Sequence, residues 1–296
     1  MSQLLQFVVT GLAAGMVYSL IALAFVVVWK SSGVANLALG QLVLMSSWFA
    51  YTMLGTAGLQ WYIAIPFVII FAVFLGWLIE RVVLRPLIAQ PILSLITVTL
   101  GMGYFIQGLV GIVWPRSQVR FTYLFKGSPY HIGSAVLLRP ELWAAIIALV
   151  LFAVLMVYFR YSRMGVAMRA TADDQKAVQA CGIPVTKIFS RSWMFTCVLA
   201  AVSGILIASI PGKVDNSLIS TGLQAFSVVI LGGLDSFVGA IIAGPIIGLA
   251  EIIGSGYLGP VTGWSGIREV VPFIIIIIVM FIRPYGLFGE ERIERI

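Results

Sequence analysis

The sequence predicts an all-α, multi-pass membrane protein with about eight to ten transmembrane helices, some of them broken by glycine or proline. Of its 296 residues, 61% are hydrophobic and only 10% are charged, whereas soluble domains contain about 25% charged residues. No Asp, Glu, Lys or Arg occurs between Ser31 and Ile79, and only residues 55–58 (Gly-Thr-Ala-Gly) interrupt this apolar stretch. Because one span needs about 20 apolar residues, the stretch predicts two membrane helices joined by a turn.

Successive apolar runs predict nine spans in a single membrane domain that covers residues 1–296. The first run is too long for the apolar region of a signal peptide, so we expect it to be the first span. Gly33, Asn36 and Gly40 weaken the start of the second span and are compatible with a break inside the membrane. The predicted spans are residues 7–29, 33–54, 61–79, 92–113, 142–159, 193–210, 218–234, 237–255 and 270–282.

The distribution of basic residues predicts the orientation of the chain. If the loop 160–191 is cytoplasmic, alternation of nine spans places 12 of the 18 Lys and Arg residues on the cytoplasmic side and 6 outside. Cytoplasmic loops of membrane proteins carry this excess of Lys and Arg. We therefore expect a cytoplasmic C-terminus and an external N-terminus.

The predicted external loop, residues 114–140, mixes basic and aromatic side chains. Arg116, Arg120 and Lys126 alternate there with aromatic residues such as Phe121 and Tyr123. This composition is typical of side chains at the headgroup level of a bilayer, and it also suits contact with a partner protein. The sequence leaves both interpretations open.

The predicted cytoplasmic loop, residues 160–191, contains the strongest local signal for a helix. Thr171 is placed to cap a helix, Asp173 and Asp174 would lie in its first turn, and Gly182 would end it. These residues predict a short helix over residues 172–181. A helix of this length is marginal alone in water, so we expect it to pack either against the other helices of the chain or against a partner.

Two acidic residues are candidates for a role inside the membrane, where ionisable side chains are costly. Asp235 lies in a Leu-Gly-Gly-Leu-Asp-Ser segment that predicts a connection between two spans. Glu251 lies within the apolar residues 241–253. A carboxylate in such a place is expected to be protonated, paired, or in contact with an aqueous path. The sequence leaves open whether Glu251 has a structural or a path role.

Several function classes are disfavoured by the residues that the chain lacks. His131 is the only histidine, and no cluster of Cys, His or carboxylate residues has the spacing of a metal site, so neither a metal centre nor enzymatic chemistry is expected. No Gly-x-x-x-x-Gly-Lys-Ser/Thr motif occurs, so this chain has no P-loop for ATP. The net charge of +7 does not predict a nucleic-acid partner, because the basic residues form no face outside the membrane runs.

Five groups of residues, in order along the chain, carry a family resemblance. They are Asn36-Leu-Ala-Leu-Gly-Gln41; Ile79-Glu-Arg-Val-Val-Leu-Arg-Pro86; Gly101-Met102 with Gln107; Arg160-Tyr-Ser-Arg-Met-Gly165 with Arg169-Ala170 and Gly182-Ile183; and Ala225-Phe226 with Leu231-Gly-Gly233 and Ala250-Glu251. Together they resemble the motifs of the LivH-like permeases of branched-chain amino acid ABC importers, the hydrophobic amino acid uptake family. The resemblance covers nearly the whole chain.

The resemblance implies a transmembrane permease subunit of the bacterial inner membrane. Such a subunit forms the path for a small substrate, for example a branched-chain or other hydrophobic amino acid. In this family a periplasmic binding protein delivers the substrate, and two separate ABC ATPase subunits hold ATP-Mg and drive alternating access. A second, LivM-like permease usually completes a heterodimer. The resemblance therefore implies no cofactor on this chain and no enzymatic activity of its own.

The resemblance also implies which residues act. The helix 172–181 would be the coupling helix that inserts into a groove of the ATPase. The residues implied in ATPase coupling are Arg163, Gly165, Arg169, Thr171, Asp173, Asp174, Gln175, Ala177, Val178, Cys181 and Gly182. The residues implied on the substrate path are Asn36, Gly40, Gln41, Gly101, Gln107, Phe226 and Glu251.

One departure from the family pattern concerns the substrate. Where the family commonly has His and Glu, this chain has Leu39 and Gln41. The second segment therefore lacks a carboxylate for an ammonium group, and an apolar or aromatic acid, an amide or another small metabolite also fits the sequence. The alternative function is a free-standing channel or secondary transporter for a small solute, which would work without ATPase subunits.

Overall fold

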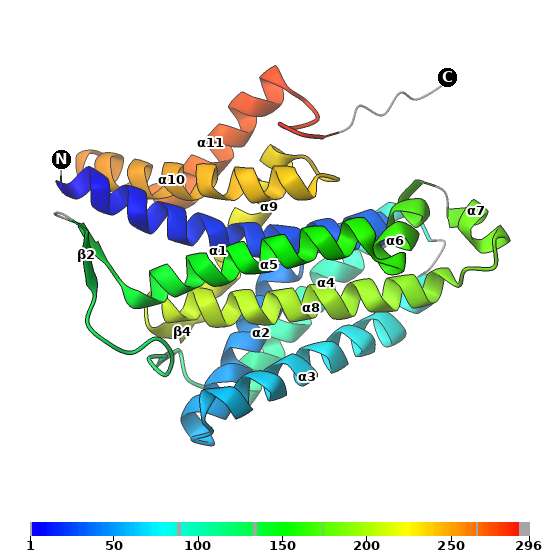
Figure 1. Cartoon of the computed structure of the whole chain (residues 1–296), viewed down its shortest axis with the longest axis horizontal. Helices are drawn as coiled ribbons and strands as arrows, with labels where there is room; N and C mark the ends of the chain where they lie inside the picture. The colour runs from blue at the N-terminus through cyan, green and yellow to red at the C-terminus, as the bar shows by residue number, and fades with distance from the viewer. Residues whose placement is uncertain (1, 88–89, 133–134, 174, 265, 290–296) are drawn as a thin grey trace.

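The structure is a computed structural model that describes residues 2–87, 90–132, 135–173, 175–264 and 266–289. It is an elongated bundle of helices with short strands at one end (Figure 1). The helices are α1 (Ser2–Ser32), α2 (Leu39–Tyr51), α3 (Trp61–Ile79), α4 (Ile92–Val113), α5 (Arg139–Tyr161), α6 (Arg163–Asp173), α7 (Gln175–Ala180), α8 (Val185–Ser209), α9 (Ser220–Gly232), α10 (Phe237–Thr262) and α11 (Ile267–Ile282). Short π or 3-10 segments are η1 (Thr52–Thr56), η2 (Glu80–Leu84), η3 (Arg85–Leu87) and η4 (Asn216–Ile219), and the strands are β1 (Gln118–Arg120), β2 (Tyr130–Ile132), β3 (Ala135–Leu137) and β4 (Lys213–Asp215).

The predicted helical membrane architecture is confirmed. Within the described residues, six helices are long and apolar enough to cross a membrane: α1, α3 with its continuation to Leu87, α4, α5, α8 and α10. The other three predicted spans are shorter helices, α2, α9 and α11. The predicted turn at residues 55–58 lies close to the observed one: residues 55 and 56 belong to η1, and residues 57–60 form the non-helical link to α3. The helix that contains the predicted sixth span is longer than that span: α8 begins at Val185, before residue 193, and includes Lys187 and Arg191.

Helices α1 and α8 form the centre of the bundle. In their apolar windows 89% and 78% of the residues are buried inside the chain, compared with 28–39% in the other four long helices. Figure 1 shows α10 running along one side of α1 and α3 running along α8. The outer helices leave apolar side chains such as Phe67 and Phe105 exposed, which suits a surface covered by lipid.

Glycine residues allow α1 and α10 to pack closely. A Cβ atom on Gly15 would lie 2.5 Å from the carbonyl oxygen of Gly244, and one on Gly248 would lie 2.5 Å from the Cα of Gly15. The hydroxyl of Ser19 donates to the carbonyl of Ile241 on the facing helix at 3.2 Å. Small residues at four-residue spacing are typical of close helix packing in membranes. The spacing of Gly244 and Gly248 thus positions α10 on α1.

We expect Gly248→Ala to destabilise the bundle by about 1–3 kcal/mol, because the added methyl group overlaps the backbone of α1 and the two helices must separate. Gly259→Ala, on the same helix, is the matched control, since no atom lies within 4 Å of the added Cβ. The measurement is the midpoint of thermal unfolding of the purified chain in detergent. Equal midpoints for the two variants would contradict this account of the α1–α10 contact.

The two ends of the bundle carry different elements. The end with the strands, called here the strand end, holds β1 paired antiparallel with β4 and β2 paired antiparallel with β3. The opposite end, called the α6 end, holds α6 and α7. The aromatic residues predicted in loop 114–140 behave differently from one another: Phe121 is buried within the chain, whereas Tyr130 remains 45% exposed.

Candidate functional site

The chain is not helical between α1 and α2, over residues 33–38. Gly33 has a φ of +66°, a left-handed conformation that suits glycine, and it ends α1. Helix α2 begins only at Leu39. The predicted span 33–54 therefore starts too early, and the break suggested by Gly33, Asn36 and Gly40 is confirmed.

Side chains satisfy several of the backbone groups that this break releases. The Oδ1 atom of Asn36 accepts a hydrogen bond from the N–H of Ala38 at 3.1 Å. From α4, the hydroxyl of Thr99 donates to the carbonyl of Ala35 at 3.1 Å and accepts from the N–H of Leu37 at 3.5 Å. Non-helical backbone at membrane depth is tolerated only when it is buried in protein or lines a cavity. Asn36 and Thr99 thus hold the broken segment against α4.

The first turn of α2 packs against the start of α9. A Cβ on Gly222 of α9 would lie 2.6 Å from the backbone nitrogen of Gly40, and a Cβ on Gly40 would overlap the carbonyl of Ile219. Only glycine permits this approach of two backbones. Two short helices, α2 and α9, therefore begin side by side in the interior of the bundle.

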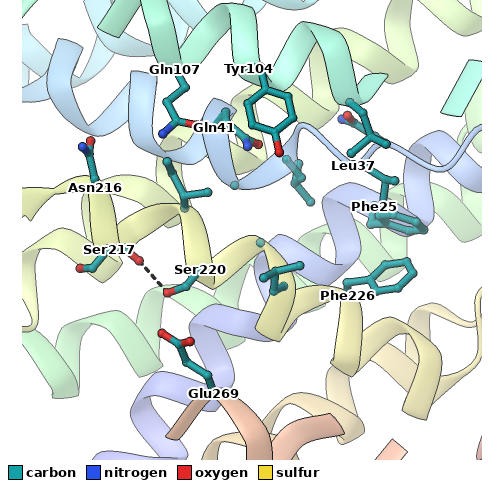
Figure 2. A pocket seen from close by; sticks show the side chains of 17 residues that line it. Phe25, Leu37, Gln41, Tyr104, Gln107, Asn216, Ser217, Ser220, Phe226 and Glu269 are labelled. Carbon is teal, nitrogen blue, oxygen red and sulfur yellow. Dashed lines mark hydrogen bonds between the residues drawn. The ribbon is translucent and has the colours of Figure 1, made fainter. Parts of the chain in front are cut away.

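A cavity of about 600 Å³ lies beside these two helix starts and is called here the central cavity. The broken segment, the first turn of α2, one face of α4, and the η4–α9 segment line it, together with Phe25 of α1 and Glu269 of α11. Figure 2 shows Gln41, Tyr104 and Gln107 on one side of this space and Glu269 on the other.

The lining of the central cavity has a polar part and an apolar part. In Figure 2, Asn216 and Ser217 lie at one end and the rings of Phe25 and Phe226 lie at the other. The two rings pack edge to face with centroids 5.6 Å apart. A cavity that pairs apolar walls with a few polar groups is typical of small-molecule sites. The volume and lining suit a small solute that has an apolar body and a polar end.

Asp215 fixes the polar end of the cavity. Its carboxylate accepts from the N–H of Ser217 at 3.0 Å, which caps η4, and pairs with the ammonium of Lys213 at 2.5 Å. Partial burial raises the pKa of Asp215, but the hydrogen bonds from Lys213 and Ser217 lower it more, so the pKa lies below its usual range. The residue therefore stays ionised at neutral pH and holds the η4 turn in place.

The central cavity brings together most of the residues that were predicted on a substrate path. Those that line it are Asn36, Gly40, Gln41, Gln107 and Phe226. Gly101 of α4 does not line the cavity. It is exposed, and a Cβ added to it would have no neighbouring atom within 4 Å. Sequence reasoning missed Glu269, which directly precedes the predicted last span, residues 270–282.

Glu251 does not line the central cavity. It is fully buried in α10, accepts a hydrogen bond from the hydroxyl of Tyr18 at 3.2 Å, and forms an ion pair with Arg268 of α11. Of the three states expected for this carboxylate, the paired one is observed. The pair joins α11 to the core formed by α1 and α10.

At the α6 end, one sequence motif forms the turn between α5 and α6. The hydroxyl of Ser162 accepts from the N–H of Gly165 at 2.9 Å and so caps α6. A Cβ on Gly165 would overlap the carbonyl of Phe159, so only glycine fits against the last turn of α5. One turn further, the guanidinium of Arg169 donates to the carbonyls of Phe159 and Arg160, which end α5.

The predicted helix over residues 172–181 is wrong at its start. The chain is already helical from Arg163, because Ser162 provides the cap, and Thr171 lies inside α6 with its hydroxyl bonded to the carbonyl of Ala167 at 2.7 Å. Asp173 ends α6 and Gln175 begins α7, while Asp174 lies outside the described residues. The predicted end is confirmed to within one residue: α7 ends at Ala180, and Gly182, two positions later, adopts a φ of +77°.

The residues of α7 and of the turn that follows it are divided between two environments. Val178 is buried against the bundle, whereas Ala177, Cys181 and Gly182 are exposed. Arg163 at the start of α6 is also exposed. Part of the loop therefore packs on the chain's own helices, and part of it faces outward.

Residues 7–280 match the family described as "Branched-chain amino acid transport system / permease component". The chain belongs to this permease family. It is 30% identical to the high-affinity branched-chain amino acid transport system permease protein LivH of Salmonella typhimurium, over 99% of this chain and 97% of that protein. It is 28% identical to the permease protein BraD of Pseudomonas aeruginosa, over 99% and 98%. It is also 27% identical to a probable LivH of Methanocaldococcus jannaschii, over 92% and 88%.

Among solved structures, PsaBC from Streptococcus pneumoniae in complex with Fab aligns with 93% of this chain and 91% of that chain, with a TM-score of 0.49 and 13% identity. The family assignment agrees with the observed architecture of a multi-pass membrane permease component. Within the described residues no group of three or more His, Cys, Asp or Glu side chains is placed to hold a metal ion.

A second motif of this permease chain also has a structural explanation. In the segment 79–86, Glu80 is buried and its two carboxylate oxygens receive the Nε and Nη2 groups of Arg85 at 3.2 and 3.3 Å. This two-point ion pair closes the π-helical turn η2 at the end of α3. The pair lies at the α6 end of the permease, and neither residue lines the central cavity.

We expect Arg169→Ala to destabilise the permease by about 1.5–3 kcal/mol, because it removes charged hydrogen bonds from the carbonyl groups that end α5. Arg163→Ala, on the same helix, removes the same charge from an exposed side chain and is the matched control. Thermal unfolding of the purified protein measures the difference. The role assigned to Arg169 is wrong if the two variants unfold at the same temperature.

Proposed function

We propose that this chain is the transmembrane permease subunit of an ABC importer and that the central cavity forms part of its translocation path. The substrate is a small solute such as a branched-chain or other hydrophobic amino acid, delivered by a periplasmic binding protein. Separate ATPase subunits bind ATP-Mg and drive the transport cycle, and this chain binds no cofactor. The main support is the position of the cavity at a broken helix inside a permease of this family.

Broken helices are where many transporters build their solute sites, because helix ends and unwound backbone there offer polar groups at membrane depth. The central cavity adjoins the break at residues 33–38 and the starts of α2 and α9. Its amides from Gln41 and Gln107 and the rings of Phe25 and Phe226 supply polar and apolar contacts for one small molecule.

A second permease subunit, LivM-like in the family pattern, is proposed to close the cavity. Three side chains that line the cavity remain open to the outside of this chain: Tyr104 is 73% exposed, Leu223 56% and Leu100 43%. Gly108 lies on the same helix as Tyr104, and a Cβ added to it would have no neighbouring atom within 4 Å. This glycine therefore permits the close approach of another helix. The path is thus proposed to lie between two permease subunits.

The α6 end is proposed to dock two ABC ATPase subunits. Ala177, Cys181 and Gly182 face outward there. Ser162, Gly165 and Arg169 fix the angle of α6 against α5, so a displacement of α7 is transmitted to a membrane helix. A coupling element is expected to have this mechanical role. The family resemblance implies that role for residues of this loop.

The α6 end is proposed to be cytoplasmic, with the strand end facing the periplasm and the binding protein. Helices that run toward the α6 end carry Lys30 and Arg160 in their last turns or are followed by Arg85 and Arg283, in addition to the basic residues of α6 and α8. The excess of Lys and Arg at this end follows the positive-inside rule. The C-terminus, which follows Arg283, is then cytoplasmic.

Labelling of single cysteines tests this orientation. Cys181 is exposed and Cys197 is buried, so Cys181 is expected to react with a membrane-impermeant maleimide from the cytoplasmic side only. Ser128→Cys, introduced into a chain that lacks Cys181 and Cys197, is expected to react from the periplasmic side, because Ser128 is exposed at the strand end. Reaction of both positions from the same side would contradict the orientation.

A substitution of Gln41 tests the path. We expect Gln41→Leu to lower ATP-driven uptake of leucine by about threefold to tenfold, since the loss of one polar contact costs about 0.5–1.5 kcal/mol. Gln224→Leu is the matched control, because Gln224 is a buried amide on α9 that does not line the cavity. Uptake is measured in proteoliposomes that contain the complete complex, and thermal unfolding of the same preparation is recorded.

If Gln41→Leu transports leucine at the rate of the unsubstituted protein, Gln41 does not contact the substrate. If transport and thermal stability fall together, the role of Gln41 is structural.

The proposed function as a whole depends on ATP. Uptake by this chain alone, without ATPase subunits and driven by an ion gradient, would replace the ABC importer by a secondary carrier.

A further inference from the structure

Glu269 is the only charged side chain in the described lining of the central cavity. It is exposed and lies in the first turn of α11, and its carboxylate has no hydrogen bond or ion pair with any other described residue. Figure 2 shows its carboxylate pointing from α11 toward Ser220 and the cavity. A negative charge in a partly apolar cavity, without a basic residue among the described lining residues, is a site for a cationic group.

The neighbouring residue explains why Glu269 remains unpaired. Arg268, one position earlier, is held by Glu251, and Tyr18 donates a hydrogen bond to the same carboxylate oxygen. The guanidinium of this neighbour is therefore directed to Glu251 on α10, and Arg268 does not line the cavity. The carboxylate of Glu269 keeps its capacity for a ligand.

The other side of the cavity offers hydrogen-bond donors. Among the described residues, the backbone N–H groups of Leu39, Gly40 and Gln41 have no acceptor, as is usual for the first turn of a helix. The Nδ2 group of Asn36, which is 1% exposed and lines the cavity, also has no acceptor. A buried donor without an acceptor is costly and is independent support for a ligand here. The start of α2 adds the positive end of its helix dipole.

We propose that the central cavity is a two-point site for a zwitterion, in which Glu269 binds the ammonium group and the start of α2, with Asn36, receives the carboxylate. This inference rests on the proposed function and names the residues that would recognise the two charges of its solute. The apolar body of the solute packs against Phe25 and Phe226. The carboxylate that is absent at position 41 is then supplied from α11, by a residue outside the motif.

This assignment selects one class of solute among those that the sequence left open. An apolar acid places a carboxylate near Glu269 and leaves that residue without a partner, so it is disfavoured. A neutral amide leaves both Glu269 and the start of α2 without a charged partner. An amino acid with an apolar side chain offers a charged group to Glu269, another to the start of α2, and an apolar body to the rings of Phe25 and Phe226.

The test uses the complete complex of this permease with its partner permease, ATPase subunits and binding protein. We expect Glu269→Gln to lower ATP-driven leucine uptake into proteoliposomes by about tenfold or more, because a hydrogen bond to a charged group is lost. Glu269→Asp keeps the charge and is expected to retain most of the uptake. Both variants are expected to assemble into the complex. In the absence of ligand, both are expected to unfold at the same temperature as the unsubstituted complex.

A second measurement separates recognition from structure. Thermal stabilisation of the purified complex, without binding protein, is recorded with leucine, with leucinamide, which lacks the carboxylate, and with 4-methylpentanoate, which lacks the ammonium group. Leucine and leucinamide are expected to stabilise the unsubstituted complex more than 4-methylpentanoate does, and Glu269→Gln is expected to abolish that difference. A merely structural role of Glu269 would shift all three responses equally.

Two results would overturn the assignment while leaving the permease function intact: leucine uptake that is unchanged in Glu269→Gln, or stabilisation by 4-methylpentanoate equal to that by leucinamide in the unsubstituted complex. Failure of the proposed function has a different signature. In that case the unsubstituted complex itself shows no ATP-dependent uptake of leucine, and the assignment of Glu269 falls with it.

Discussion

The backbone groups released between α1 and α2 need hydrogen-bond partners, because lipid provides none. Asn36 and Thr99 supply them, and in doing so they fix the broken segment to α4. The break also makes α2 start within the bundle, where its first turn meets the start of α9 through Gly40 and Gly222. The central cavity is bordered by these same elements. The position of the cavity is therefore a consequence of how one interruption of a membrane helix is satisfied.

Close packing of small residues holds the elements around that interruption in register. Gly15 and Gly248 bring α1 and α10 into backbone contact, and this leaves α1 almost completely enclosed. An enclosed α1 presents Phe25 to the cavity on one face and Tyr18 to Glu251 on another. Because no hydrophobic force drives helices together within lipid, such contacts and the few interhelical hydrogen bonds must determine the arrangement.

The sequence was sufficient for features that depend on local composition. Apolar runs predicted the long helices, the Gly-Thr-Ala-Gly stretch predicted the turn before α3, and Gly33 with Asn36 indicated the break. The start of α8 was missed, because Lys187 and Arg191 resemble loop residues although they lie in a helix. The start of α6 was missed because the capping pattern at Thr171 is stronger in sequence than the cap formed by Ser162.

Features that depend on distant contacts could not be predicted in the same way. Strands β1 and β4 have three residues each and pair across about a third of the chain, which is too short and too distant a signal for a sequence pattern. For the candidate site, the motif around the break identified Asn36, Gly40 and Gln41, which line the cavity. No pattern distinguished Glu269, which lines it, from Glu251, which does not. That distinction depends on which way the start of α11 faces.

The pairing of Arg268 connects these two carboxylates. Arg268 and Glu269 are adjacent, so a free Arg268 would neutralise the only charge in the described lining of the cavity. Glu251, which also accepts a hydrogen bond from Tyr18, holds the guanidinium, because a buried carboxylate requires a cation in any case. The ion pair thus has two effects: it joins α11 to α1 and α10, and it leaves Glu269 available. If Glu269 binds the ammonium group of the solute as proposed, Glu251 contributes to recognition from outside the cavity, by removing the competing cation.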